Sequence, residues 1–168
     1  MGVRHARSED MDTVAKINVD SWQTAFRGIV DDSYLDGMNA EKTKEGLERG
    51  FGKRPLCVYE DENGHVLGSS IYGDSRDAEV QELSEYTGEL RAIHIDPEYK
   101  GQGIGKEIFK FVASDLKNRG HKKMYLWVFE KNLAAIRFYE KMGGKLIYRC
   151  DRMVGDKLYA SLCFGYDL

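Results

Sequence analysis

Residues 96–106 read Asp-Pro-Glu-Tyr-Lys-Gly-Gln-Gly-Ile-Gly-Lys, and this stretch decides the fold. It follows an alternating apolar segment, 89–95, that predicts a strand, and it precedes a segment, 104–118, with apolar residues at helical spacing. A glycine turn between a strand and a helix presents free backbone N–H groups at the positive end of the helix, where phosphate binds well. The same glycines serve equally in a turn that binds nothing.

The turn matches neither of two common nucleotide-binding motifs. No G-x-x-x-x-G-K-[ST] sequence occurs, and the spacing of Gly101, Gly103 and Gly105 differs from G-x-G-x-x-G. An ATP-dependent transferase is therefore disfavoured, because no Walker lysine or carboxylate motif for Mg²⁺ accompanies the turn.

Working outward from the turn, strand and helix patterns alternate along the whole chain. No repeat or linker divides it, so we expect one domain, 1–168, of the α/β class with a mixed, mostly antiparallel sheet flanked by helices. A hairpin is expected at 61–64, where Asn-Gly tolerates positive φ at both positions. The predicted strands are 3–7, 54–60, 65–73, 89–95, 123–129, 145–152 and 157–167, and the predicted helices are 8–26, 31–35, 40–49, 104–118 and 132–142.

The composition of the chain argues against several classes of function. Lys and Arg number 25 against 28 Asp and Glu, so the net charge of −3 does not suit a general nucleic-acid binder. The longest apolar run, 124–129, is too short to span a bilayer, and we expect no membrane partner. Three widely spaced cysteines without a CxxC pair indicate free thiols in a reducing cytoplasm, and the histidines lack metal-ligand spacing, so no metal is expected.

Three motifs in order carry a resemblance to a known family. Residues 100–105 are similar to the [RQ]-x-x-G-x-[GA] turn of the GNAT superfamily of N-acetyltransferases. Residues 132–143, Asn-Leu-Ala-Ala-Ile-Arg-Phe-Tyr-Glu-Lys-Met-Gly, resemble its N-x-x-A-x-x-[FY]-Y-x-x-x-G helix, and 21–29 resembles the first helix of a bacterial branch. Two positions depart from the pattern. Lys100 replaces Arg or Gln, and Gly143-Gly144 replaces Gly-Phe, which puts the shape of the acceptor site in doubt.

The resemblance implies a site for acetyl-CoA between two splayed central strands. The pantetheine arm would pair with the backbone of Ile93, His94 and Ile95, and the backbone N–H of Ile93 would be the oxyanion donor. The pyrophosphate would lie on the N–H groups of Gln102 to Lys106. The expected cofactor-binding residues also include Lys100, Gly101, Gln102, Gly103, Ile104, Gly105, Lys106 and Asn132.

Two side chains are candidate catalytic residues. Tyr139 occupies the motif position near the thioether sulfur, and a phenol is protonated at neutral pH, so it is the candidate acid. Glu89 is the candidate base, because it precedes Lys100 by an interval seen in family members that use a glutamate. Strand alternation predicts that Glu89, Arg91, Ile93 and Ile95 share one face. The alternatives are core packing for Tyr139, a solvated pair with Arg91 for Glu89, and ordered water as the base.

The resemblance places the acceptor beside the variable N-terminal helices. Trp22, Phe26 and Tyr34 are the expected aromatic wall of that site, although core packing explains them as well. Two acidic clusters, 31–36 and 79–85, would attract a cationic amine or form an ordinary solvated surface.

The resulting hypothesis is an acetyl-CoA-dependent N-acetyltransferase. It would transfer the acetyl group directly to a primary amine of a small molecule, peptide or protein. The alternative is a sensor of the same fold that binds acyl-CoA without turnover. A homodimer is a further expectation, because the last two strands would be open to pairing.

Overall fold

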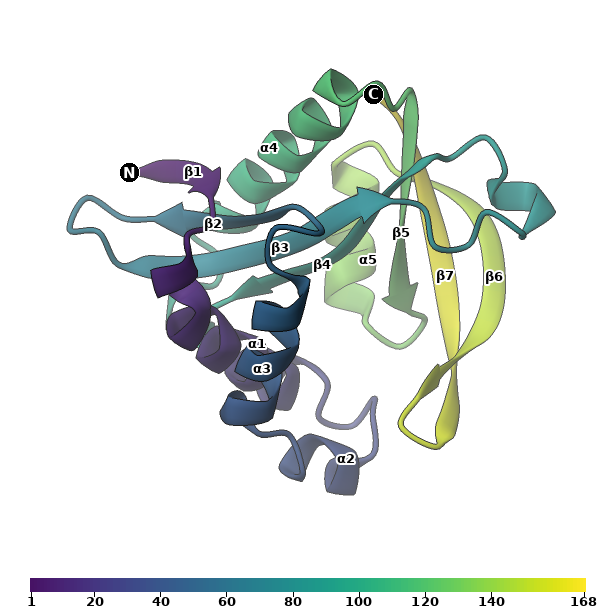
Figure 1. Cartoon of the computed structure of the whole chain (residues 1–168). Helices are drawn as coiled ribbons and strands as arrows, with labels where there is room; N and C mark the ends of the chain where they lie inside the picture. Colours follow the sequence, from purple (N-terminus) through teal and green to yellow (C-terminus); the bar gives the residue numbers. More distant parts are fainter.

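The computed structural model describes all 168 residues, and at its centre is one seven-stranded sheet with the order β1-β2-β3-β4-β5-β7-β6 (Figure 1). Only β4 and β5 pair in parallel; the other neighbours are antiparallel. The strands are β1 Gly2–His5, β2 Leu56–Glu60, β3 Val66–Asp74, β4 Gly88–Ile95, β5 Lys123–Phe129, β6 Lys145–Val154 and β7 Lys157–Asp167. The helices are α1 Met11–Ala25, α2 Asp32–Asp36, α3 Ala40–Gly50, α4 Ile104–Asn118 and α5 Leu133–Lys141. The expected mixed α/β architecture is confirmed.

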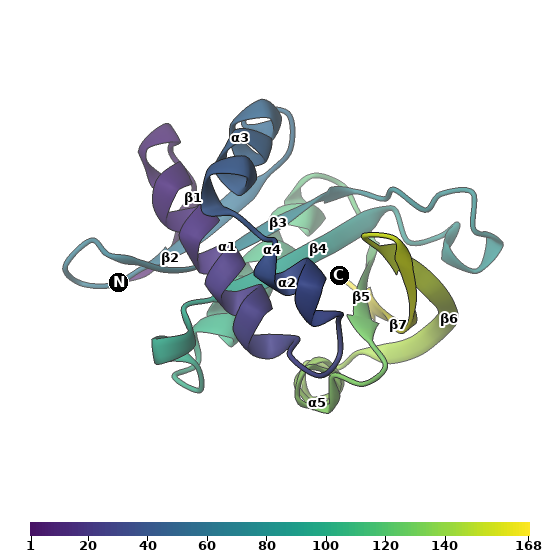
Figure 2. The same cartoon turned by 90° about the horizontal axis from the view of Figure 1, so that it is seen from below.

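Helices cover both faces of the sheet, and β2 shows how alternation divides them. Cys57 and Tyr59 belong to the main hydrophobic cluster beneath α4. Leu56 and Val58 point the other way and pack with side chains of α1 and α3. Figure 2 shows α1, α2 and α3 in front of the sheet, with α4 behind it. Residues of α5, including Tyr139, pack on the cluster beneath α4, so α4 and α5 share one face.

Side-chain hydrogen bonds explain why some elements differ from those expected from the sequence. The first long helix begins at Met11 rather than Ser8, because residues 8–10 form a 3₁₀ turn held by Asp10. The Asp10 carboxylate accepts hydrogen bonds from the Arg7 backbone N–H at 2.7 Å and from the Arg4 guanidinium. The expected hairpin joins β2 and β3, and within its turn only Gly64 has a positive φ, of 84°. Asp61 holds that turn by accepting hydrogen bonds from two backbone N–H groups.

None of the helices is long and apolar enough to cross a membrane.

Candidate active site

The site begins where β4 and β5 separate. They pair only at Gly88 with Met124 and Glu89 with Tyr125, whereas β3 and β7 follow their outer sides to the ends. Beyond residue 89, the backbone groups of β4 that face β5 therefore have no ladder partner. A cavity of about 930 Å³ occupies this gap and is lined by Ile93, His94 and Ile95. The expected splaying of the central strands is present.

A bulge at Arg91 changes which side chains of β4 share a face. Tyr72 pairs with Leu90 and Ile71 with Ala92, so Arg91 is an extra residue in β4. The bulge reverses the alternation beyond it. Leu90 belongs to the cluster beneath α4, and Ile93 and Ile95 pack against that same cluster. The expectation that Glu89 shares a face with Ile93 and Ile95 was therefore wrong.

The glycine turn forms the N-terminal end of α4. Gly101 and Gly103 have φ of 80° and 87°, a region that disfavours any residue with a Cβ. The N–H groups of residues 101–105 donate no hydrogen bond within the chain, whereas the Lys106 N–H already donates to the Gly103 carbonyl at 3.0 Å. The free donors are thus 101–105 rather than 102–106. Five such groups at a helix N-terminus fit a pyrophosphate.

Most of the expected cofactor-binding residues surround the gap. Lys100, Gly101, Gly103, Ile104, Gly105, Lys106 and Asn132 line the cavity, and Gln102 does not. A Cβ at Gly105 would approach Ile95 Cδ1 to 3.1 Å, so glycine lets the helix lie close to β4. The Asn132 side chain caps α5 by accepting a hydrogen bond from the Ala135 N–H at 3.2 Å. Asn132 therefore both caps α5 and lines the cavity.

Tyr139 reaches the cavity from α5. Its ring is half-buried, and its hydroxyl makes no hydrogen bond within the chain, whereas its carbonyl accepts one from the Tyr166 hydroxyl. Burial raises the pKa of Tyr139 to about 12, so the phenol stays protonated well above neutral pH. The Tyr166 side chain also explains why residue 144 is a glycine, because a Cβ at that position would lie 2.5 Å from the Tyr166 hydroxyl.

Strand β4 also carries two buried titratable side chains, His94 and Glu89. The His94 imidazole is buried, which lowers its pKa to about 4, and it is neutral at pH 7. Glu89 is 1% exposed, and Arg76 holds both its oxygens. Arg76 Nε donates to Oε2 at 2.9 Å and Nη2 to Oε1 at 2.6 Å, and Arg91 Nε lies 3.5 Å from Oε2. Glu89 is therefore neither solvated nor paired mainly with Arg91.

Aromatic side chains line the cavity on the side of α1. Trp22 and Phe26 meet edge to face at 4.7 Å between ring centroids, and Phe26 meets Phe129 of β5 at 5.1 Å. Tyr34, the third residue expected in this wall, does not line the cavity. It lies against Gly155 at the β6–β7 turn, 6.1 Å from the Trp22 ring.

Sequence reasoning missed a polar cluster that joins three distant segments. Asp77, in the loop after β3, accepts hydrogen bonds from the Trp127 indole at 2.9 Å and the Tyr125 hydroxyl at 3.0 Å. Arg152 of β6 contacts Asp77 and lies over the Trp127 ring at 4.4 Å. Alternation in β6 offered one signal, since Arg152 shares a half-buried face with Cys150 and Val154. Arg76, Trp127 and Arg152 all line the cavity.

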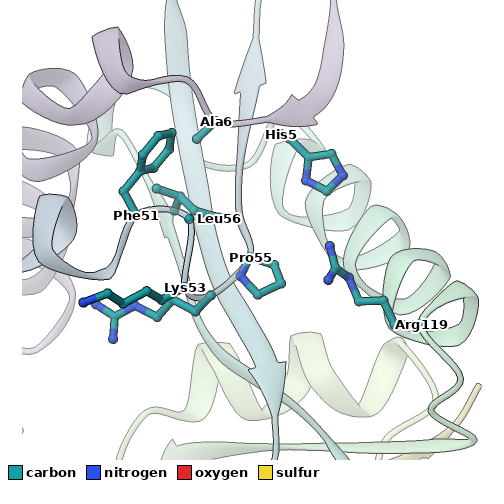
Figure 3. A pocket seen from close by; sticks show the side chains of 9 residues that line it. His5, Ala6, Phe51, Lys53, Pro55, Leu56 and Arg119 are labelled. Atoms are coloured by element: carbon teal, nitrogen blue, oxygen red, sulfur yellow. The ribbon is translucent and has the colours of Figure 1, made fainter.

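A second pocket, of about 270 Å³, lies away from this gap. Phe51 and Lys53 come from the segment between α3 and β2, His5 from β1, and Arg119 from the end of α4 (Figure 3). It shares no lining residue with the large cavity.

Comparison with known proteins shows what this architecture is similar to. The sequence pattern of the acetyltransferase (GNAT) family matches residues 14–144. The uncharacterized N-acetyltransferase YuaI of Bacillus subtilis is 35% identical over 138 residues, which cover 82% of this chain and 76% of YuaI. The spermidine N(1)-acetyltransferase of Thermoplasma acidophilum is 26% identical over 147 residues, 86% of this chain and 88% of that protein. The structure of yncA from Salmonella typhimurium with its cofactor acetyl-CoA has a TM-score of 0.72 at 18% identity, covering 98% of this chain and 92% of that one.

The family match, over residues 14–144, defines this protein, whose sheet opens beside a glycine turn, as an acyl-group transferase. The chain belongs to the acetyltransferase (GNAT) family and is an N-acetyltransferase. Acetyl-CoA is the co-substrate of such enzymes, and the free amides of the turn fit its pyrophosphate.

Proposed function

We propose that this enzyme transfers the acetyl group of acetyl-CoA directly to a primary amine of a small molecule or peptide. The observation that carries the proposal is the continuous cavity between β4 and β5. The free amides of the glycine turn line one part of it, and the aromatic wall of Trp22, Phe26 and Phe129 lines another. Both substrates therefore have a place in one cavity.

The chain's own groups supply the seat for acetyl-CoA. The N–H groups of residues 101–105 would hold the pyrophosphate, with Lys100 and Lys106 adding positive charge. The backbone groups of Ile93 and Ile95 face β5 and would hydrogen-bond the pantetheine arm as an added strand, whereas those of His94 face Ser69 of β3. The Ile93 N–H would donate to the oxyanion that develops on the thioester carbonyl.

Two side chains assist the transfer. The amine lone pair attacks the thioester carbonyl carbon, a C–N bond forms and the C–S bond breaks. Glu89, the only carboxylate lining the cavity, takes the amine proton through water. Tyr139 donates a hydrogen bond to the departing sulfur. Its pKa of about 12 exceeds that of a thiol, about 8.5, so the phenol stabilises the thiolate and solvent completes its protonation.

Direct transfer is supported by where the cysteines lie. Cys57, Cys150 and Cys163 are absent from the lining of the cavity. Burial raises the pKa of Cys57 to about 12 and also raises that of Cys163. No thiol is placed to form an acetyl-enzyme.

Steady-state kinetics tests the proposal. With acetyl-CoA and an amine both varied, a ternary complex gives intersecting double-reciprocal lines, and no acetyl-enzyme is seen by mass spectrometry with acetyl-CoA alone. Parallel lines together with a mass increase of one acetyl group would contradict direct transfer. An acyl-CoA sensor would bind acetyl-CoA and release no thiol with any amine.

Three broader properties complete the proposal. Residues 1–168 would act as one acetyltransferase domain in the cytoplasm, which three free cysteines support. Strand β6 forms an edge of the sheet and exposes apolar side chains such as Leu146 and Met153, which supports a homodimer.

A further inference from the structure

The charged side chains that line the cavity are almost all basic. Glu89 is the only acid among them, and Arg76 and Arg91 already pair with it. Three lysines lie in or near the elements assigned to acetyl-CoA: Lys100, Lys106 and Lys141. Three arginines lie elsewhere, on β4, on β6 and in the loop after β3, where CoA phosphates have no assigned contact: Arg76, Arg91 and Arg152.

The Arg152 guanidinium is held in the geometry of a preorganised binding site for an oxyanion. Its guanidinium lies over Trp127, and Nη1 is 3.3 Å from both oxygens of Asp77, so two contacts fix its plane. Its Nε and Nη2 groups donate no hydrogen bond within the chain, and the side chain is one-third exposed to the cavity. A fixed guanidinium with a free donor edge binds a carboxylate in a bidentate manner.

Four of the six acidic residues expected to attract a cation have other partners, and Glu79 and Glu82 make no ion pair. Asp31 pairs with Lys157, Asp32 and Asp36 pair with Arg27, and Glu85 pairs with Lys123 at 2.6 Å. None of these carboxylates lines the cavity. A polyamine would therefore meet excess positive charge at the acceptor side, where like charges repel.

We propose that the acceptor is a primary amine that carries a nearby carboxylate and an apolar side chain, as an apolar α-amino acid does. This inference rests on the proposed function and names its substrate class. Arg152 would bind the carboxylate, with Arg76 adding charge, and the aromatic wall of Trp22, Phe26 and Phe129 would hold the side chain. The arginines also favour the neutral amine that attacks the thioester, because a nearby positive charge disfavours an ammonium.

Matched amines test the substrate class. We would measure kcat/KM for L-leucine, L-methionine and L-phenylalanine, for the carboxamide of each, and for spermidine, with thiol release as the readout. Charge-assisted hydrogen bonds to a guanidinium predict that an acid exceeds its carboxamide by roughly 10- to 100-fold. Spermidine should be the poorer substrate.

Variants of β6 connect that preference to Arg152. Arg152→Gln should bring the acid-to-carboxamide ratio close to one, and Arg152→Lys should restore part of it, because charge returns without the planar fork. Arg149→Gln is the matched control. Arg149 is an exposed arginine of the same strand, paired with Glu130 and absent from the cavity, so its loss should keep the wild-type ratio.

The outcomes separate this inference from the proposed function. Equal kcat/KM for acids and carboxamides, a preference for spermidine, or acetyl-CoA binding without acetylation of any α-amino acid would overturn the substrate class. A ratio that survives Arg152→Gln would remove Arg152 from carboxylate binding. Failure of acetyl-CoA to bind would overturn the proposed function and this inference together.

Discussion

Arg76 holds Glu89 by two hydrogen bonds, from Nε to Oε2 at 2.9 Å and from Nη2 to Oε1 at 2.6 Å. Glu89 is almost fully buried, whereas the Arg76 side chain is half exposed, so the arginine is the partner free to move. The pair therefore brings a carboxylate into the cavity without leaving an unpaired buried charge. Glu89 is the only acid in the lining of the cavity, so variants of Glu89 test whether a side chain acts as the general base.

Glu89→Gln should lower kcat/KM near neutral pH by roughly 10²-fold, because the amide accepts no proton. The deficit should shrink as pH rises toward the pKa of the free amine, since solvent then supplies the neutral amine. A pH profile of kcat/KM measures both effects. Glu85→Gln, which breaks only a surface pair with Lys123, should follow the wild-type profile. A pH-independent deficit would mean that Glu89 positions Arg76 and Arg91 and that water is the base.

Gly103→Val should abolish acetyl-CoA binding while the protein stays folded. The φ of 87° at Gly103 makes any side chain strained, so strain must be separated from loss of the phosphate seat. Gly64→Val provides that control, because Gly64 has φ of 84° in the remote β2–β3 hairpin and equally open surroundings. Both variants should lose about 1–2 kcal/mol of unfolding free energy. Calorimetric titration should show acetyl-CoA binding lost only in the Gly103 variant; unchanged affinity there would contradict the pyrophosphate assignment.

Tyr139→Phe should lower kcat by roughly 10²-fold and leave the Kd of acetyl-CoA nearly unchanged, because only the hydrogen bond to the departing sulfur is lost. Tyr59 is a buried residue of β2 outside the cavity, and its hydroxyl also makes no hydrogen bond within the chain; Tyr59→Phe should keep the wild-type kcat. Pre-steady-state thiol release would separate the chemical step from product release. Equal rates for Tyr139→Phe and wild type would contradict the role of Tyr139 as an acid and would mean that its ring only packs in the core.

Burial of His94 should make stability fall as pH is lowered. Its pKa is about 4 in the folded state against 6.5 for an ordinary histidine, so below pH 6.5 the unfolded chain binds a proton that the folded chain does not. The contribution is fully present above pH 6.5, and about 2 kcal/mol is lost by pH 5. Urea unfolding at pH 7.5 and pH 5 should show a smaller decrease for His94→Asn than for wild type. The same decrease in both proteins would show that His94 titrates normally.

Local patterns predicted much of the fold. The strand at 123–129 has the predicted bounds, and Asn132 caps the following helix as expected, because both features depend on neighbouring residues. The positive φ of Gly101 and Gly103 likewise follows from a tight turn between strand and helix. Family motifs then pointed to residues 93–95 and to the glycine turn, most of which line the cavity between β4 and β5.

Long-range relationships could not be predicted in this way. The bulge at Arg91 is defined only by the register of β3, so alternation along β4 alone placed Glu89 on the wrong face. The contact between Asp77 and Arg152 joins residues 75 positions apart, and no local pattern indicates it. The proposed acceptor side of the cavity contains such contacts, and for that reason its arginines could not be predicted from the sequence.

The most direct test of the central claim is calorimetric titration of the wild-type enzyme with acetyl-CoA, followed in the same cell by amines while free thiol is measured. We predict one acetyl-CoA per chain and thiol release that requires an amine, with an apolar α-amino acid preferred. Binding without thiol release for any amine would contradict catalysis and favour an acyl-CoA sensor. Absence of binding would contradict the assignment of the cavity between β4 and β5.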